Sequence, residues 1–173
     1  MRRTFLLVLI TAFGASVCNP SVPNNPPENA KAHTYNVSKE MAKKIQETKK
    51  AIASDKEKLK IADEVWKHLL TKQEYHILWE KGTEKAHSGK LLNNAKDGVY
   101  VTAGCRQPVF HSKHKYDSGT GWPSFYKPIS SDAIETRTDR SFGMVRTEVV
   151  SSRCGEHLGH VFKDGPEPTG LRY

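Results

Sequence analysis

Gly-Thr-Gly-Trp-Pro-Ser-Phe at residues 119–125 decides the fold, because it places Trp and Phe around a turn built from glycine and proline. Residues 142–150 then alternate between apolar and polar side chains, as a half-buried β-strand does. His-Leu-Gly-His-Val-Phe at residues 157–162 opens a further strand, and valine-rich residues 99–101 and 109–110 flank an earlier turn. Short strands at close spacing, separated by glycine and proline, predict a mainly β protein with an antiparallel core.

The residues before this β region have helical patterns instead. Residues 38–60 carry a thin apolar stripe among lysine, glutamate and glutamine, which predicts a helix at the surface. A second helix is predicted to begin near Ala62. The sequence Thr-Lys-Gln-Glu at 71–74 is a capping box, which opens a third helix ended by Gly82. We therefore expect the helices to lie on the N-terminal side of the β core.

These stretches together resemble the B-type methionine sulfoxide reductases, which reduce methionine-R-sulfoxide in proteins. Residues 82–84, 115–119 and 146–149 also match that family, and the resemblance covers roughly residues 66–173. It implies a core of two small antiparallel sheets with the N-terminal helices packed on it. The predicted organisation is a signal peptide at 1–18, a linker at 19–37, a lysine-rich helical leader at 38–65 and the reductase domain at 66–173.

The resemblance implies a repair enzyme of the oxidative stress response. Its partners are then proteins that contain methionine sulfoxide, and a thioredoxin-like protein or small thiol as reductant. A thiolate or selenolate attacks the sulfoxide sulfur, and a proton donor must reach the sulfoxide oxygen. The alternative is a catalytically inert module that binds oxidised methionine. A third hypothesis is a degenerate zinc-ribbon interaction domain.

The resemblance also assigns the pocket residues. Trp122 matches the residue that packs against the substrate methyl group, and Phe142 is a candidate to extend this aromatic wall, although a core position is equally compatible with it. His157 and His160 match a substrate-proximal pair, in which we expect His160 to be the closer partner of the nucleophile. Arg172 would keep the surroundings of the nucleophile positive.

In the resembled family, the catalytic cysteine or selenocysteine follows an Arg-Tyr or Arg-Phe pair directly. We therefore expect the nucleophile immediately after Tyr173, and prefer a selenocysteine whose UGA codon has been read as a stop. A fragment and a true terminus are the alternatives. The 173-residue product is then expected to lack the last strand of the β core and to be inactive.

Many members of that family hold zinc with two Cys-x-x-Cys knuckles. Only the second cysteine of each knuckle is present here, as Cys105 and Cys154, whereas Thr102 and Ser151 stand at the first positions. Because a neutral hydroxyl is a poor zinc ligand, we expect no zinc and no other cofactor. The resemblance places the two cysteines close together and predicts a disulfide. Free buried thiols, or a resolving thiol, remain alternatives.

The N-terminus is typical of an exported protein. Arg2 and Arg3 precede an apolar run over residues 5–15, which is too short to cross a bilayer and resembles a signal peptide. Cys18 lies in an imperfect lipoprotein box and is a candidate for lipidation. We expect a periplasmic protein or membrane-anchored lipoprotein in a bacterium, and a secreted protein otherwise.

The net charge of +8 comes largely from lysines in the segment before the motifs, where a charge run is usually a solvated face. We therefore expect no nucleic-acid partner, and contact with a membrane only through a possible lipid anchor.

Overall fold

The computed structural model describes residues 37–54 and 58–173, with the exception of the Phe142 side chain. The predicted signal peptide, nearly all of the linker and the candidate lipidation site Cys18 lie outside the described residues. Within the described ranges, no helix is long and apolar enough to cross a membrane.

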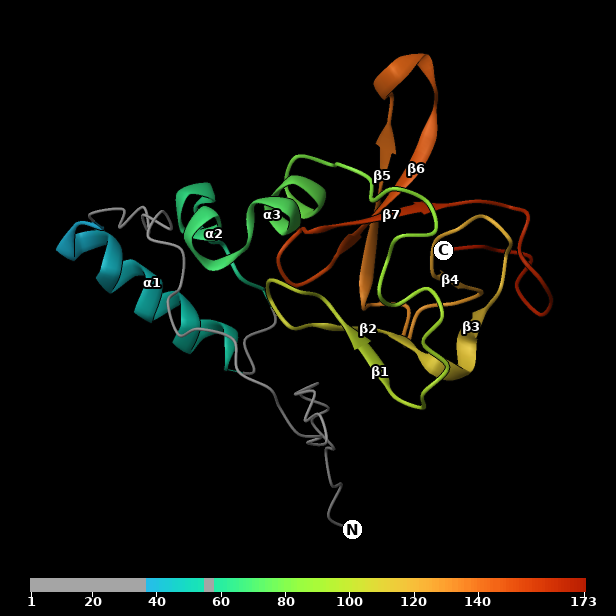
Figure 1. Cartoon of the computed structure of the whole chain (residues 1–173), viewed down its shortest axis with the longest axis horizontal. Helices are drawn as coiled ribbons and strands as arrows, with labels where there is room; N and C mark the ends of the chain where they lie inside the picture. The colour runs from blue at the N-terminus through green and yellow to red at the C-terminus, as the bar shows by residue number, and fades with distance from the viewer. Residues whose placement is uncertain (1–36, 55–57) are drawn as a thin grey trace, which may run out of the picture. The chain divides into compact units, whose positions relative to one another are not determined.

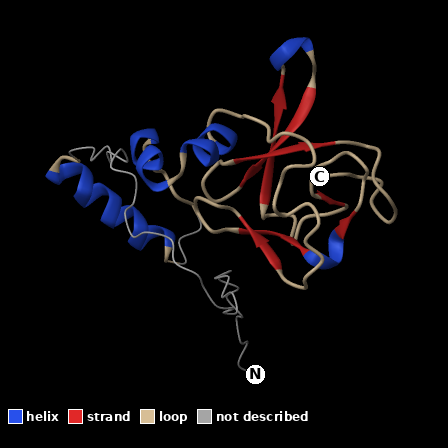
Figure 2. Ribbon diagram, viewed as in Figure 1, coloured by secondary structure: helices blue, strands red, loops and turns tan. Residues whose placement is uncertain are grey.

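Three helices lie on one side of the described chain, as Figure 2 shows: α1 (Lys39–Ile52), α2 (Asp63–Leu69) and α3 (Lys72–Leu78). Ser38 caps α1 by accepting a hydrogen bond from the backbone N–H of Met41. The predicted capping box of α3 is confirmed, since Thr71 and Glu74 bond to each other's backbone N–H groups. Helix α3 ends earlier than expected, at Leu78, and α1 ends at Ile52.

The strands form an antiparallel core, which confirms the predicted fold class. They are β1 (Val99–Val101), β2 (Pro108–His111), β3 (Lys115–Tyr116), β4 (Ser124–Phe125), β5 (Ile134–Asp139), β6 (Arg146–Ser151) and β7 (His157–Val161). Among the described residues they make three small sheets, β1-β2, β3-β4 and β5-β6-β7. The hairpin of β5 and β6 projects away from the other sheets, with the short 3₁₀ turn η2 (Ser141–Gly143) at its tip (Figure 1).

Strand β6 differs from the half-buried strand that its alternation predicted. It begins at Arg146, because residues 141–143 form the turn η2 instead. It is the central strand of its sheet, and Val149 and Val150 are both buried although consecutive side chains point to opposite faces. Both faces of β6 are therefore covered at this point.

Two hydrophobic clusters hold the elements together. The first joins the helices to the loop after β1, with Trp66 fully buried against Cys105 and stacked on Trp79 at 5.0 Å between ring centroids. The second lies between the sheets. There Phe110 stacks on Phe125 with ring centroids 4.4 Å apart, and Tyr173 packs against Phe110. Burial of aromatic side chains of this size dominates the stability of a small core.

The last two residues extend the β structure between two strands. Arg172 and Phe162 exchange both backbone hydrogen bonds, so this residue pairs with the continuation of β7. Tyr173 and Phe125 do the same, which ties the C-terminal residue to β4, as its place beside that strand in Figure 1 shows. The segment therefore connects the strand that carries the histidines with the strand that follows Trp122.

Candidate active site

A β-bulge in strand β7 brings His157 and His160 together. In a regular strand, residues three apart point to opposite faces. Here Val149 pairs with Gly159 and Val150 pairs with His157, so Leu158 is an extra residue without a partner in β6. The bulge reduces the effective separation of the histidines to two, and their rings meet edge to face with centroids 5.5 Å apart.

His157 is held by a buried carboxylate. Its Nδ1 lies 2.8 Å from Oε1 of Glu148, and the Nζ of Lys81 donates to Oε2 of the same carboxylate, also at 2.8 Å. Burial lowers the pKa of His157, and the hydrogen bond with Glu148 only partly offsets this effect. Burial alone would raise the pKa of Glu148, but the bonds from Lys81 and His157 outweigh it and hold that pKa below its ordinary value. The surroundings therefore favour an ionised Glu148 beside a neutral His157.

His160 is held by a different carboxylate at its other nitrogen. Its Nε2 lies 2.7 Å from Oδ2 of Asp139, which also accepts from Arg146 at 2.8 Å. Hydrogen bonds from Ser141, followed by those from His160 and Arg146, hold the pKa of Asp139 well below its ordinary value. An ionised carboxylate only accepts, so Nε2 of His160 carries the proton in this bond. Within the described chain, Nε2 of His157 and Nδ1 of His160 make no hydrogen bond to protein groups.

Trp122 is exposed yet fixed in place. The side chain is 39% exposed, and its Nε1–H donates to the carbonyl of Glu84 at 2.9 Å. The backbone N–H of His87 donates to the carbonyl of Gly121, which adopts a positive φ of 90°. This left-handed backbone favours glycine, and a Cβ at Gly121 would also come within 2.8 Å of the His87 ring, which would have to shift. An exposed, immobilised indole of this kind can receive an apolar group of a ligand.

Three hydroxyls brace the loop that carries Trp122. The Oγ of Ser118 lies 2.8 Å from that of Thr120 and 2.7 Å from that of Ser124, and Ser124 also donates to the carbonyl of Trp122. Ser124 is buried at the start of β4. This chain of hydroxyls fixes the loop against the strand that pairs with Tyr173.

Arg172 makes a two-pronged ion pair with Asp164. Its Nε and Nη2 donate to the two carboxylate oxygens at 2.9 and 2.8 Å, and these bonds lower the pKa of Asp164. The guanidinium also lies over the Phe162 ring, 4.3 Å from its centroid. Asp164 and Phe162 thus hold the charge of Arg172 in place directly before Tyr173.

The structure places the predicted site residues in three groups. His157 and His160 lie together, Trp122 lies on the loop before β4, and Arg172 lies between β7 and β4. Nothing is described of the Phe142 side chain, which was the candidate for extending the aromatic wall. Sequence reasoning missed four charged side chains that hold the predicted ones. They are Lys81, Asp139, Glu148 and Asp164.

The four knuckle positions converge around a disulfide. Cys105 and Cys154 are bonded, with their Cα atoms 6.4 Å apart. The hydroxyl of Thr102 lies 3.4 Å from Sγ of Cys105, and that of Ser151 lies 3.3 Å from Sγ of Cys154. Sulfurs joined in a disulfide are not thiolates, and neutral hydroxyls do not replace them, so this donor set does not fit a structural zinc ion.

A third potential metal ligand, Glu156, lies within 4.8 Å of both sulfurs. It is fully buried and accepts from the backbone N–H of Cys105 at 2.9 Å. Burial raises the pKa of Glu156, which favours the neutral acid over the anion that a metal requires. Glu156 therefore acts as a buried acceptor for the knuckle backbone.

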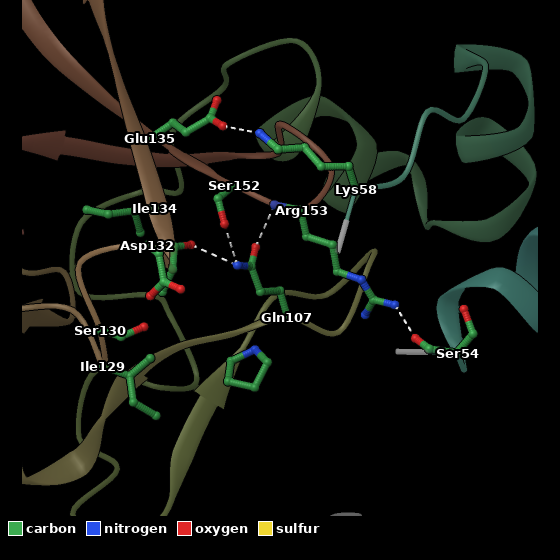
Figure 3. A pocket seen from close by; sticks show the side chains of 12 residues that line it. Ser54, Lys58, Gln107, Ile129, Ser130, Asp132, Ile134, Glu135, Ser152 and Arg153 are labelled. Atoms are coloured by element: carbon green, nitrogen blue, oxygen red, sulfur yellow. Dashed lines mark hydrogen bonds and ion pairs between the residues drawn. The ribbon is translucent and has the colours of Figure 1, made fainter. Parts of the chain in front are cut away.

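A cavity of about 810 Å³ is lined by Gln107, Ser152 and Arg153 among others (Figure 3), and neither His157 nor His160 lines it. Gln107 donates to Ser152 while accepting from the backbone N–H of Arg153. The Arg153 guanidinium bonds to Ser54, and Lys58 pairs with Glu135 across the cavity. Lys58 and Glu135 thus bind each other, Arg153 bonds to backbone carbonyls, and none of the predicted pocket residues lines the cavity.

Comparisons with known proteins give a consistent result. The SelR domain matches residues 70–173 of this chain. A peptide methionine sulfoxide reductase MsrB of Methanosarcina mazei is 55% identical over 116 residues, which cover 67% of this chain and 83% of that protein. The proteins of the same name from Leptospira interrogans and Acinetobacter baylyi are 54% and 53% identical, and the matches cover 86% and 84% of their lengths.

Proposed function

The chain belongs to the SelR-domain family of B-type methionine sulfoxide reductases, and we propose that it repairs proteins by reducing methionine-R-sulfoxide with a nucleophile that follows Tyr173. Reduction of methionine sulfoxide is the activity that the names of its relatives state. The stereochemistry, the nucleophile and the reductant are the parts proposed here.

The observation that carries the proposal is the pairing of the last two residues. Arg172 pairs with Phe162, so continuation of this antiparallel ladder sets the residue after Tyr173 opposite His160. Tyr173 pairs with Phe125, so the same continuation sets that residue opposite Ser124, directly after the loop of Trp122. Both ladders thus lead the next side chain towards the histidine pair and the exposed indole.

The pocket residues match the demands of the reaction. A thiolate or selenolate attacks the sulfoxide sulfur, the S–O bond breaks, and the product is methionine with a sulfenic or selenenic acid on the enzyme. Two further thiols reduce that acid, release water and form a disulfide between themselves. In this scheme Trp122 receives the methyl group, His160 delivers the proton to the sulfoxide oxygen, and Arg172 favours the anionic nucleophile.

Selenocysteine is the nucleophile we propose, with a thioredoxin-like protein or a small thiol as reductant. No cysteine stands within the loop that Thr120 occupies, so the enzyme would depend on an external thiol. The nucleotide sequence after the Tyr173 codon tests this directly. We expect UGA followed by an in-frame extension, and UAA or UAG at that position would exclude selenocysteine.

An activity assay tests the proposal at the level of the protein. Chains extended by the native residues, with selenocysteine or cysteine after Tyr173, should reduce a methionine-R-sulfoxide peptide. The matched 173-residue product should not reduce it. Turnover by that product would contradict the proposed position of the nucleophile, and so would inactivity of both extended chains.

A second function is favoured by the exposure of Trp122. Without a nucleophile, the same pocket could still bind oxidised methionine as an inert module. Calorimetry with a methionine-R-sulfoxide peptide and its reduced form separates the two functions. Selective binding combined with inactivity of the extended chains would favour the inert module.

The proposed setting is outside the cytoplasm. The Cys105–Cys154 disulfide supports an oxidising compartment, where such bonds persist. We propose export by the N-terminal signal, with a lipid on Cys18 as an open alternative, and a domain that works without zinc. Mass spectrometry of the mature protein from its native host tests the lipid, and metal analysis of the purified protein tests the zinc.

A further inference from the structure

Lys81 makes an ion pair that connects the helical side of the domain to the histidine site. It follows α3 and has a left-handed backbone, with φ of 57°. Its Nζ lies 2.8 Å from Oε2 of Glu148, a residue 67 positions further along the chain. The Lys81 side chain is 55% exposed, whereas that of Glu148 is 2% exposed. The lysine therefore brings a positive charge from the surface to a carboxylate inside the β5-β6-β7 sheet.

Glu148 needs that charge in order to remain ionised. An isolated carboxylate loses its hydration when it is buried, and this cost favours the protonated acid. The hydrogen bonds of the Glu148 side chain within the described residues go to Lys81 and His157 alone, one to each oxygen. The ammonium of Lys81 occupies Oε2, which leaves Oε1 as the acceptor for His157.

We propose that Lys81 is a positioning residue for the reduction of methionine sulfoxide, which holds His157, through Glu148, as the neutral tautomer with the proton on Nδ1. The arrangement leaves Nε2 of His157 as a lone-pair acceptor. His160 has the opposite arrangement, because Asp139 engages its Nε2. The free Nδ1 of His160 is therefore also a lone-pair acceptor while the ring is neutral, and His160 can donate a proton from Nδ1 only as the imidazolium.

The charges around His157 determine how Lys81 acts on its titration. Glu148 faces the ring from β6, Lys81 reaches the same carboxylate from the loop after α3, and His160 lies next to it on β7. Lys81 and His160 oppose a positive charge on His157, and Glu148 favours one. Without Lys81, the carboxylate and the imidazole are left to share a proton, so the pair takes it up at a higher pH.

The test uses nuclear magnetic resonance of the imidazole nitrogens, because it needs no turnover. In the 173-residue chain, Lys81→Met should raise the midpoint of the His157 titration by about one pH unit and weaken its preference for Nδ1–H. Lys81→Arg, which keeps the charge, should restore the native midpoint. Lys90→Met is the matched control, since this exposed lysine of the same loop has no ion pair within the described ranges.

An unchanged midpoint and tautomer in Lys81→Met would overturn the proposal, and so would failure of Lys81→Arg to restore them. A loss of folding is excluded by comparing thermal unfolding of the variants, and Glu148→Gln gives a second route to the same change in tautomer.

The functional arm rests on the proposed function and uses the extended chain that carries the nucleophile. The acid limb of its kcat/KM profile should move to higher pH in Lys81→Met and return in Lys81→Arg. An inactive extended chain would contradict the proposed function while leaving the resonance result intact, so the two failures are distinguishable.

Discussion

Glu148 and Glu156 are both buried carboxylates, close in sequence, but their surroundings are opposite. Glu148 lies between Lys81 and His157, and these partners keep its pKa below the ordinary value. Glu156 accepts from the backbone N–H of Cys105 and has no ion pair among the described residues, so burial raises its pKa. The histidine region, around His157 and His160, thus contains charged side chains that pair with one another. The disulfide region, around Cys105 and Cys154, contains neutral groups and a covalent bond.

The largest effect should come from the charge network of the histidine region. In the extended chain, Asp139→Asn removes the carboxylate that orients His160, so kcat/KM for a methionine-R-sulfoxide peptide should fall about 10²–10⁴-fold. Asp132→Asn, which changes an exposed carboxylate on the separate cavity of Figure 3, should have little effect. Equal activity of both variants would show that proton delivery does not depend on the orientation of His160 by Asp139.

The next effect concerns the covalent bond of the disulfide region. The Cys105–Cys154 bond closes a loop with a sequence separation of 49, and such a crosslink stabilises by about 2–4 kcal/mol. In urea unfolding of the native chain, reductant should lower the free energy of unfolding by that amount. The same measurement should show no reductant effect in a chain with both cysteines changed to serine. Two reactive thiols at these positions in the unreduced, denatured protein would contradict the bond.

Replacing each carboxylate by its amide compares the two regions directly. Glu148→Gln leaves Lys81 and His157 without their anion, and charged hydrogen bonds of this kind contribute about 2 kcal/mol. Glu156→Gln replaces a carboxyl group that favours its neutral form by a neutral amide, and should cost less than about 1 kcal/mol. Chemical denaturation at neutral pH measures both values, and the reverse order would show that the two environments have been misjudged.

The smallest effect is in the pH dependence of stability. The pKa of Asp139 is lowered from 3.8, so its contribution is present above that value and lost as the pH falls through the folded-state pKa. The pKa of Glu156 is raised from 4.5, so its contribution is present below that value and lost as the pH rises through the folded-state pKa. Asp139→Asn should therefore flatten the acid side of the stability curve, and Glu156→Gln the side above pH 4.5.

Unfolding free energies measured from acid to neutral pH check both slopes. A flattened acid side in Glu156→Gln, rather than in Asp139→Asn, would contradict the assignment of charge to the two regions.

Local sequence patterns predicted much of the fold, because they depend on near neighbours. The capping box at Thr71 and Glu74 satisfies backbone groups of its own helix, so four consecutive residues suffice to identify it. The strands around Val99 and Phe110 were visible for the same reason. Strand β6 was predicted too long, because Ser141–Gly143 forms a turn that an alternating pattern does not reveal.

The supporting carboxylates could not be predicted from such patterns. Asp139 and Glu148 stand in strands where polar residues normally alternate outward, and each bonds to a histidine only after β7 has been paired and bulged at Leu158. Lys81 looks like any surface lysine until the loop after α3 is folded against β6. These contacts join residues distant in sequence, so the sequence holds no local signal for them.

The sequence by itself determined the family and the antiparallel class and supplied the candidate pocket residues, since these follow from motifs read along the chain. The tertiary structure alone decided which nitrogen of each histidine is engaged, which carboxylate keeps its charge, and how Arg172 and Tyr173 lie between β7 and β4. The physical reason is that charge state and ring orientation depend on burial and on partners brought from distant strands, which exist only once the sheets have formed.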